Sequence, residues 1–484
     1  MSLQAAFRSA QSALAINARQ TSIVSRNISE ADASGYSRRI ALVEPGQQSQ
    51  SSTARIIRAT DTSLQSAALD AQSIVQRNEA ISKSLEALQQ IVGDPADETS
   101  PAAHLAKLKS DLLAAASSPQ DQATLAAAVN SAKSLANDLA DAATTVQKAR
   151  AQTDLDMAAS VATINSLLKN FETINTTIVS GQLRGDDVAD ALDRRDAILS
   201  DLSKEIAIST APGPNGDMAI YTDSGVALFQ RTARTVSMEP TETYSASVTG
   251  QSVYVDGVAV TGSSARMPLR AGALAGLSQF RDDLSVAFQS QLDELASGLI
   301  SAFSQAPQTS SSSVTRTGMI TWSGGPMLPA SGMAGVAASV RVDPAVEQDP
   351  TLLRDGGIGG APDYLYNASG AASFSSRLDE LVDALGAPRD SNAIHLPKRL
   401  SVGDIALQSQ AWLEGVRQQA DDESTNSNAV LTQASAALSD AIGVNVDDQM
   451  SRMLDLENSY QAAAKMMATV DSMYAALFSA IRGG

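Results

Sequence analysis

The sequence of 484 residues contains no cysteine, only two histidines and only 4% aromatic residues. The absence of cysteine excludes disulfides, thiolate catalysis and zinc sites built on thiolates. His104 and His395 are too few for a histidine-rich metal site. No apolar run approaches the ~18 residues that cross a bilayer. We therefore expect no metal, no cofactor and no insertion into a membrane.

The formal net charge is -18. Phosphate backbones and anionic membranes attract basic surfaces, so this charge argues against nucleic acid and membrane surfaces as partners. A chain of this length predicts about two to four domains. The N-terminal segment has no basic cluster followed by an unbroken apolar stretch, and hence no sign of a cleaved secretory signal.

Apolar residues near both ends recur at alternating steps of three and four, which is the pattern of a coiled-coil seam. The C-terminal stripe consists of Met453, Leu456, Tyr460, Ala463, Met467, Val470, Tyr474, Leu477 and Ile481. The N-terminal stripe consists of Leu3, Phe7, Ala10, Leu14, Asn17, Thr21, Val24 and Ile28, and it turns polar at Asn17 and Thr21. Two such stripes can bury each other as a parallel or an antiparallel pair.

A helix of ~40 residues is about 60 Å long, which is more than a compact core can cover. We therefore expect most of each terminal helix to be buried by other copies or other subunits and to be poorly ordered alone. The alternative is a long helical hairpin within one chain.

The middle of the chain changes its period from helical to alternating at about Ile206. The Asp256-Gly257 pair between alternating valines predicts a β-hairpin with a type I′ turn. Ser100-Pro101 predicts a capped helix start, and helix is expected again from about Val402 to the C-terminus. The fold class is predicted as α+β, mainly α: a coiled-coil or bundle framework built by the terminal segments, with inserted β-rich domains.

Four parts are predicted. Residues 1–50 with 440–484 form a terminal coiled-coil domain for polymerisation. Residues 51–205 with 270–306 and 400–439 form a helical rod. Residues 206–269 form a β-rich insert, and residues 307–399 form a variable mixed insert.

Catalytic motifs are not found: there is no phosphate-binding loop ending in Gly-Lys-Ser/Thr, no Gly-x-Ser-x-Gly elbow and no His-Glu-x-x-His. The acids from Asp186 to Asp196 lack the glycine of a calcium loop, and Asp190 lies four residues before Arg194. This spacing favours a salt-bridged helix face over a cation site. We expect no enzymatic activity.

Four segments resemble flagellar axial proteins, in the same order along the chain. They are "NISEADASGYSRR", "DALDRRDAILSDLSKEI", "GALAGLSQFRDDLSVAFQSQLDELASGLISAF" and "GVNVDDQMSRMLDLENSYQAAAKMMATVDSMYAAL". The ending Gly35-Tyr36-Ser37-Arg38 looks most like the hook-associated protein 1 branch, the FlgK family. Residues from about 310 to 400 carry no such resemblance.

The resemblance implies a structural subunit of the hook–filament junction, exported by the flagellar type III pathway and located outside the cell in the flagellum. It implies as partners the hook protein, the second junction protein or filament subunits, further copies in a ring, and an export chaperone on the C-terminal helix. Its expected assembly interface comprises Leu3, Phe7, Leu14, Val24, Ile28, Gly35, Tyr36, Met453, Leu456, Tyr460, Met467, Val470, Tyr474, Leu477 and Ile481. The alternatives are another axial protein, or a secreted helical adhesin or effector.

Gly35 and Tyr36 carry a specific hypothesis. Gly35 would allow a turn with positive φ after the first helix, and Tyr36 would anchor the chain as it enters the next domain. The alternative for Gly35 is an ordinary helix stop.

Overall fold

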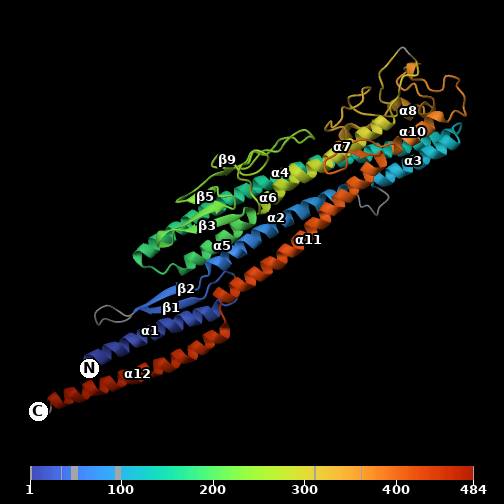
Figure 1. Ribbon diagram of the computed structural model, residues 1–484. Helices are drawn as coiled ribbons and strands as arrows, with labels where there is room; N and C mark the ends of the chain where they lie inside the picture. The colour runs from blue at the N-terminus through green and yellow to red at the C-terminus, as the bar shows by residue number, and fades with distance from the viewer. Residues whose placement is uncertain are drawn as a thin grey trace. The chain divides into compact units, whose positions relative to one another are not determined.

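The computed structural model describes residues 3–33, 35–44, 53–92, 100–309, 312–360 and 362–482. It is 63% helical and 9% strand, which confirms the predicted mainly α class with small inserted sheets (Figure 1). None of the described helices is both long enough and apolar enough to cross a bilayer.

The chain forms two compact units. Unit 1 comprises Met1–Val75, Thr163–Thr235 and Ser427–Gly484, and unit 2 comprises Gln76–Ala162 and Val236–Asn426. The division falls within α2 (Thr62–Val92), α4 (Gln122–Arg184) and α11 (Val402–Ile442). The four-part organisation expected from the sequence stays a prediction.

Unit 1 contains, besides parts of those three helices, two terminal helices, a hairpin and a small sheet. These elements are α1 (Leu3–Ser29), β1 (Arg39–Glu44), β2 (Thr53–Arg58), α5 (Ala189–Glu205), β3 (Ile208–Pro212), η1 (Pro214–Gly216), β4 (Met218–Thr222), β5 (Ala227–Gln230), β6 (Thr232–Ala233) and α12 (Val446–Arg482). Strands β1 and β2 are antiparallel, with Arg39 opposite Arg58. Strands β3 to β6 form one sheet in chain order.

The sheet of unit 1 packs on α4 through aromatic rings. Phe171 of α4 meets Phe229 of β5 edge to face, with ring centroids 4.9 Å apart. Ile178, Ile220 and Leu228 are also fully buried in this unit. Along β4, buried Ile220 and Thr222 alternate with half-buried residues, which is the period-2 pattern that the sequence predicts for this region.

Unit 2 is a helical bundle with short strands and loops. Its further elements are α3 (Pro101–Ser117), β7 (Val236–Ser237), β8 (Tyr254–Val255), β9 (Val258–Ala259), α6 (Ala273–Gln279), η2 (Phe280–Leu284), α7 (Ser285–Ala302), β10 (Ile320–Thr321), η3 (Ala337–Ser339), β11 (Arg341–Val342), α8 (Pro344–Gln348), α9 (Leu352–Asp355), η4 (Pro362–Tyr364), α10 (Ser376–Gly386), β12 (Arg389–Asp390) and β13 (Arg399–Leu400). Its core combines small and branched side chains of α3, α4, α7, α10 and α11, such as Leu108, Ala132 and Leu299.

Two local predictions for unit 2 are confirmed. The Ser100 side chain accepts a hydrogen bond from the Ala103 N–H and caps α3, which starts at Pro101. Strands β8 and β9 pair across Asp256 and Gly257, whose φ angles of 49° and 82° are those of the type I′ turn.

The C-terminal helical stretch differs from the prediction, because it is two helices. α11 ends at Ile442 and α12 begins at Val446. The Asn445 side chain accepts a hydrogen bond from the Asp448 N–H at 3.2 Å, so Asn445 acts as an N-cap. Asp447 and Asp448 then lie in the first turn, where the helix dipole favours acids.

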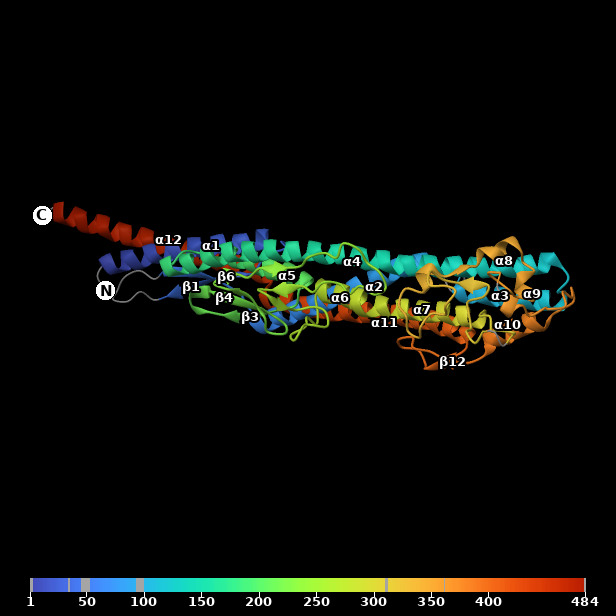
Figure 2. The ribbon, with the colours of Figure 1, turned by 90° about the horizontal axis from the view of Figure 1, so that it is seen from above.

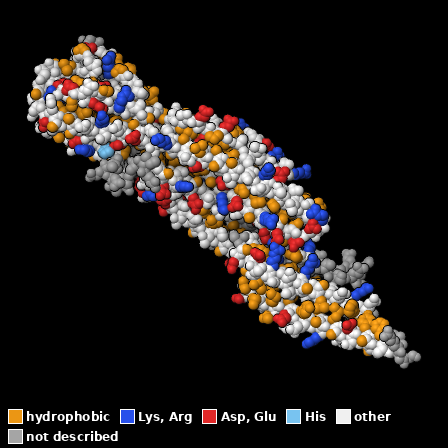
Figure 3. All heavy atoms as spheres, turned by 180° about the vertical axis from the view of Figure 1, so that it is seen from behind, with side chains coloured by type: hydrophobic (Ala, Val, Ile, Leu, Met, Phe, Trp, Pro, Cys, Tyr) orange, Lys and Arg blue, Asp and Glu red, His pale blue; other side chains and the backbone are white. Residues whose placement is uncertain are grey.

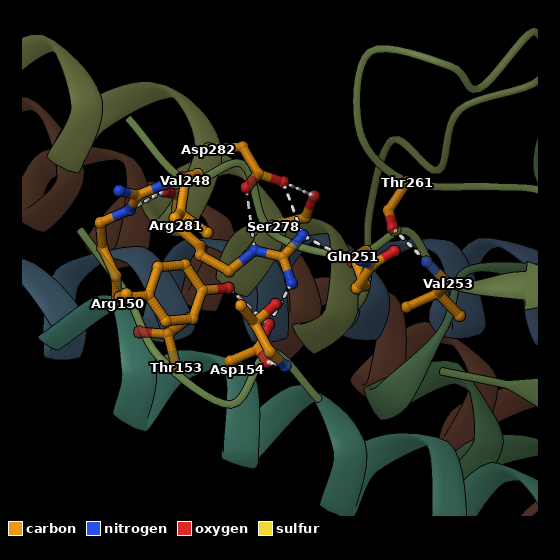
Figure 4. A network of polar contacts seen from close by, with 12 residues as sticks. Arg150, Thr153, Asp154, Val248, Gln251, Val253, Thr261, Ser278, Arg281 and Asp282 are labelled. Atoms are coloured by element: carbon orange, nitrogen blue, oxygen red, sulfur yellow. Dashed lines mark hydrogen bonds and ion pairs between the residues drawn. The ribbon is translucent and has the colours of Figure 1, made fainter. Parts of the chain in front are cut away.

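A buried ionic network ties a loop of unit 2 to its helices (Figure 4). Arg281 of η2 pairs with Asp154 of α4, and their side chains are 0% and 1% exposed. Asp154 also accepts hydrogen bonds from the Tyr244 hydroxyl at 2.8 Å and from the Thr241 N–H at 2.6 Å.

A second guanidinium holds the same loop. Arg150 of α4 donates to the Val248 carbonyl at 2.8 Å and lies 4.8 Å from the Tyr244 ring centroid. Burial lowers the pKa of Arg150, whereas Asp282 raises the pKa of Arg281 against the opposing effect of burial. At Gly250 a Cβ atom would collide with the Arg281 guanidinium, so the close approach of this loop requires glycine.

Candidate assembly site at the two ends of the chain

Helices α1 and α12 lie side by side and antiparallel in unit 1 (Figures 1 and 2). Phe7 of α1 meets Tyr474 of α12 edge to face, with ring centroids 6.5 Å apart and an interplanar angle of 86°. The two stripes read from the sequence therefore face each other within one chain. Of the two orientations left open by the sequence, the structure has the antiparallel one.

Burial along the two stripes is uneven. Val24, Ala463 and Val470 are buried, whereas the exposed fractions of Tyr460 and Leu477 are 52% and 48%. The half-buried members are Leu3, Phe7, Leu14, Ile28, Met453, Leu456, Met467 and Tyr474. The Ile481 side chain lies outside the described residues. Each of the two helices thus buries the stripe of the other only in part.

Further apolar side chains of α12 lie beside the seam and face solvent. Met466, Met473 and Phe478 are 56%, 54% and 62% exposed. Figure 3 shows apolar side chains gathered over this end of unit 1 on the face that it draws. α12 also extends past the start of α1 in both ribbon views, so its last turns have no α1 residue opposite them (Figures 1 and 2).

The turn after α1 is organised by Asn27, whose side chain is buried. Its Oδ1 accepts hydrogen bonds from the Tyr36 hydroxyl and from the Arg39 N–H, both at 2.9 Å. Its Nδ2 donates to the Arg39 carbonyl at 3.0 Å and to Gln449 Oε1 at 2.9 Å. The anchoring role expected of Tyr36 thus has a physical contact, namely the hydrogen bond to Asn27.

Gly35 has φ of +78°, and no heavy atom lies within 4 Å of the position that a Cβ atom would take. Glycine is favoured here by the backbone conformation and not by space. Tyr36 stacks under the Arg39 guanidinium at 4.9 Å, and burial raises the pKa of its phenol.

Three arginines and three aspartates fasten this turn and the β1–β2 hairpin to α5. Arg39 donates to Asp190 at 2.9 Å and to Asp193 at 2.5 Å. Arg58 of β2 pairs with Asp193 at 2.9 Å and with Asp196 at 2.5 Å. Spacing of three residues places the three carboxylates along one face of α5.

The third cation of this set is Arg26 of α1, which pairs with Asp190 at 2.7 Å. Its hydrogen bond holds the pKa of Asp190 below the usual 3.8, and Arg39 acts in the same direction. The aspartates of α5 therefore form long-range ion pairs that connect elements, which the local spacing in the sequence did not indicate. No cluster of three or more His, Cys, Asp or Glu side chains suited to a metal occurs among the described residues.

Two regions of the chain match models of known protein families. Residues 85–312 match the model described as the flagellar hook-associated protein FlgK helical domain. Residues 440–480, which include nearly all of α12, match the model of the flagellar basal body rod FlgEFG protein C-terminal region. These matches support the FlgK family of flagellar hook-associated proteins for this chain.

Two curated relatives are the flagellar hook-associated protein 1 of Salmonella typhimurium and that of Salmonella typhi. Each is 28% identical over 191 residues, which cover 39% of this chain and 34% of the relative. The chain therefore matches about a third of the length of these relatives. The solved flagellar hook junction protein FlgK from Burkholderia pseudomallei is 20% identical, with a TM-score of 0.43 over 53% of this chain and 46% of that one.

The family predicted from the sequence motifs is thus confirmed. The Asp-Arg-Arg helix and the Gly-x-Leu-x-Gly-Leu helix lie within the helical-domain match, and the C-terminal signature lies within the second match. The segment from Asn27 to Arg39 precedes both matches and remains a resemblance. Residues 313–439 lie between the matches.

Proposed function

We propose that this protein is a structural subunit at the hook–filament junction of a bacterial flagellum, where it links the hook to the filament. The match to the FlgK helical-domain model supports this function. The observation that carries it is the half-buried seam of α1 and α12, because a surface so rich in exposed apolar side chains needs a protein partner.

Assembly would complete the burial of this seam. Neighbouring copies in a ring, the hook protein and the second junction protein or filament subunits are the proposed partners. Each Å² of apolar surface that they cover contributes about 25 cal/mol, which offsets the entropy lost when the terminal helices become ordered. Folding of the ends and assembly are then coupled.

The proposed site of action is outside the cell, in the flagellum, after export through the flagellar type III pathway. An export chaperone is proposed to cover the apolar side of α12 before export. No catalytic activity is assigned, and the interface residues read from the sequence remain the proposed contact set.

The decisive experiment is electron microscopy of cells of the source bacterium that lack the protein. Hooks without filaments are expected, together with recovery on expression of the full chain. Deletion of residues 1–28 should abolish recovery, because α12 then loses its partner helix. Normal filaments in the deletion strain would refute the junction role, and a secreted adhesin would keep its binding without residues 1–28.

Point variants test the surface itself. Met473→Glu and Phe478→Glu place charges on exposed positions, so the isolated chain should keep its stability while filament attachment falls. Ser472→Glu is the matched control, because Ser472 is an exposed polar residue on the same helix. If all three variants attach filaments as well as the unchanged chain does, this side of α12 is excluded from the contact.

A further inference from the structure

Two polar pairs cross the seam between α1 and α12. Asn17 Nδ2 donates to Ser459 Oγ at 3.0 Å, and Asn27 Nδ2 donates to Gln449 Oε1 at 2.9 Å. From Asn17 to Asn27 the chain advances by ten residues, and from Ser459 to Gln449 it goes back by ten. Both pairs therefore belong to one antiparallel offset of the two helices.

Three members of these pairs are amide side chains that are buried, whereas the fourth, Ser459, lies at an exposed position. Asn17, Asn27 and Gln449 are 6%, 1% and 1% exposed. Asn27 uses both acceptor positions and both donor positions of its side chain, since it also bonds Tyr36 and the backbone of Arg39. A buried amide that loses its partner is costly, so these pairs are sensitive to the position of α12.

The apolar residues of the seam do not fix the offset by themselves. Because they repeat every seven residues, a slide of α12 by one heptad again brings apolar residues opposite apolar residues. The polar pairs do not tolerate this slide. Advancing α12 by seven residues would place Leu456 opposite Asn27 and Met466 opposite Asn17.

We propose that Asn17 with Ser459 and Asn27 with Gln449 specify the register and the partner of the terminal helices. They select the pairing of α1 with α12 at one offset, over slipped pairs and over pairs of α12 with α12 of another copy. Polar residues buried in a coiled-coil seam are known to act on register and partner choice at some cost in stability. The inference rests on the geometry of one chain and is independent of the proposed function.

Disulfide trapping tests the register directly, because the chain has no cysteine of its own. Gln20 and Leu456 line one small cavity beside the seam and keep the same offset as the two polar pairs. A Gln20→Cys/Leu456→Cys chain should therefore close a disulfide in the observed register. A Gln20→Cys/Ala463→Cys chain reports the slide by one heptad.

The test variant makes the seam apolar while it keeps Asn27: Asn17→Leu, Ser459→Leu and Gln449→Leu. We expect the yield of the 20–463 disulfide relative to the 20–456 disulfide to rise about tenfold or more, because the two polar pairs across the seam no longer oppose the slide. Disulfides between two chains through position 456 should also appear. An unchanged ratio without such crosslinks would overturn the proposal.

Controls separate register from general damage. Leu14→Met with Met467→Leu conserves apolar volume and should leave the disulfide ratio unchanged. Asn17→Ser with Ser459→Asn exchanges the two side chains across the seam and should keep the observed register. Asn17→Ser alone should raise the share of the 20–463 disulfide. These two variants test the role of the polar pair even where the apolar triple variant does not fold. Equal ratios of the 20–463 to the 20–456 disulfide in both variants would reject that role.

Discussion

Replacement of Arg281 by methionine is the sharpest test of how unit 2 is held together. The change removes the cation beside Asp154, whose side chain is 1% exposed. The Tyr244 hydroxyl and the Thr241 N–H would still donate to the carboxylate, but no positive charge would pair directly with it. Removing one partner of a buried ion pair costs about 3–5 kcal/mol. This is a large part of the ~5–15 kcal/mol that stabilises a typical domain.

The assay is urea unfolding followed by tryptophan fluorescence. The chain has two tryptophans, Trp322 and Trp412, and both lie in unit 2, so the signal reports that unit. Lys133→Met is the matched control, because Lys133 and Glu347 form an ion pair whose side chains are 48% and 35% exposed. Such a pair contributes only about 0–1 kcal/mol.

A double change identifies the cause of the loss. Asp154→Asn in the Arg281→Met chain removes the uncompensated charge, and we expect it to restore part of the lost stability. A loss for Arg281→Met no larger than that for Lys133→Met would refute the reasoning that an unpaired buried carboxylate dominates.

Three further predictions concern unit 1. Gly35→Val should lower the free energy of unfolding by about 1–3 kcal/mol through strain at φ of +78°, and Gly35→Asn should lower it less. Thermal melts compare the two variants, and equal melting temperatures would contradict the conformational argument. Because the pKa of Asp190 is lowered in the fold, its contribution to stability is present above pH 3.8 and is lost as the pH falls through the folded value. Arg26→Gln should therefore flatten the acid side of the stability–pH curve measured by urea titration, and an unchanged slope would exclude Arg26 as the cause. Hydrogen exchange of the isolated chain should show protection near Asn27 that falls toward Phe478, and uniform protection would contradict the partial burial of α12.

The terminal stripes and the turns were predictable because their signals are local. A heptad repeat, a Ser-Pro helix start and an Asp-Gly hairpin each depend on residues within a few positions of one another. The break between α11 and α12 had a local signal too, since Gly443 and Asn445 are a helix stop and a cap. The continuous heptad pattern after it outweighed this signal.

The polar contacts of the candidate site were not predictable in the same way. The partners of Asp193 are Arg39 and Arg58, which are 154 and 135 residues away in the chain. The pair of Asn27 with Gln449 spans 422 residues. Sequence spacing can place a carboxylate or an amide on a helix face, but it cannot say which distant element covers that face.

The pairing of the first helix with the last sets the order in which the molecule can fold. Asn17 meets Ser459, which lies 442 residues later in the chain. During synthesis, or when the chain passes N-terminus first through a narrow channel, α1 emerges long before α12. The hairpin of α1 and α12 can then close only after the last residues have appeared, and contacts so distant in the chain form slowly. Until α12 has appeared, the apolar stripe of α1 is exposed and can bind another protein.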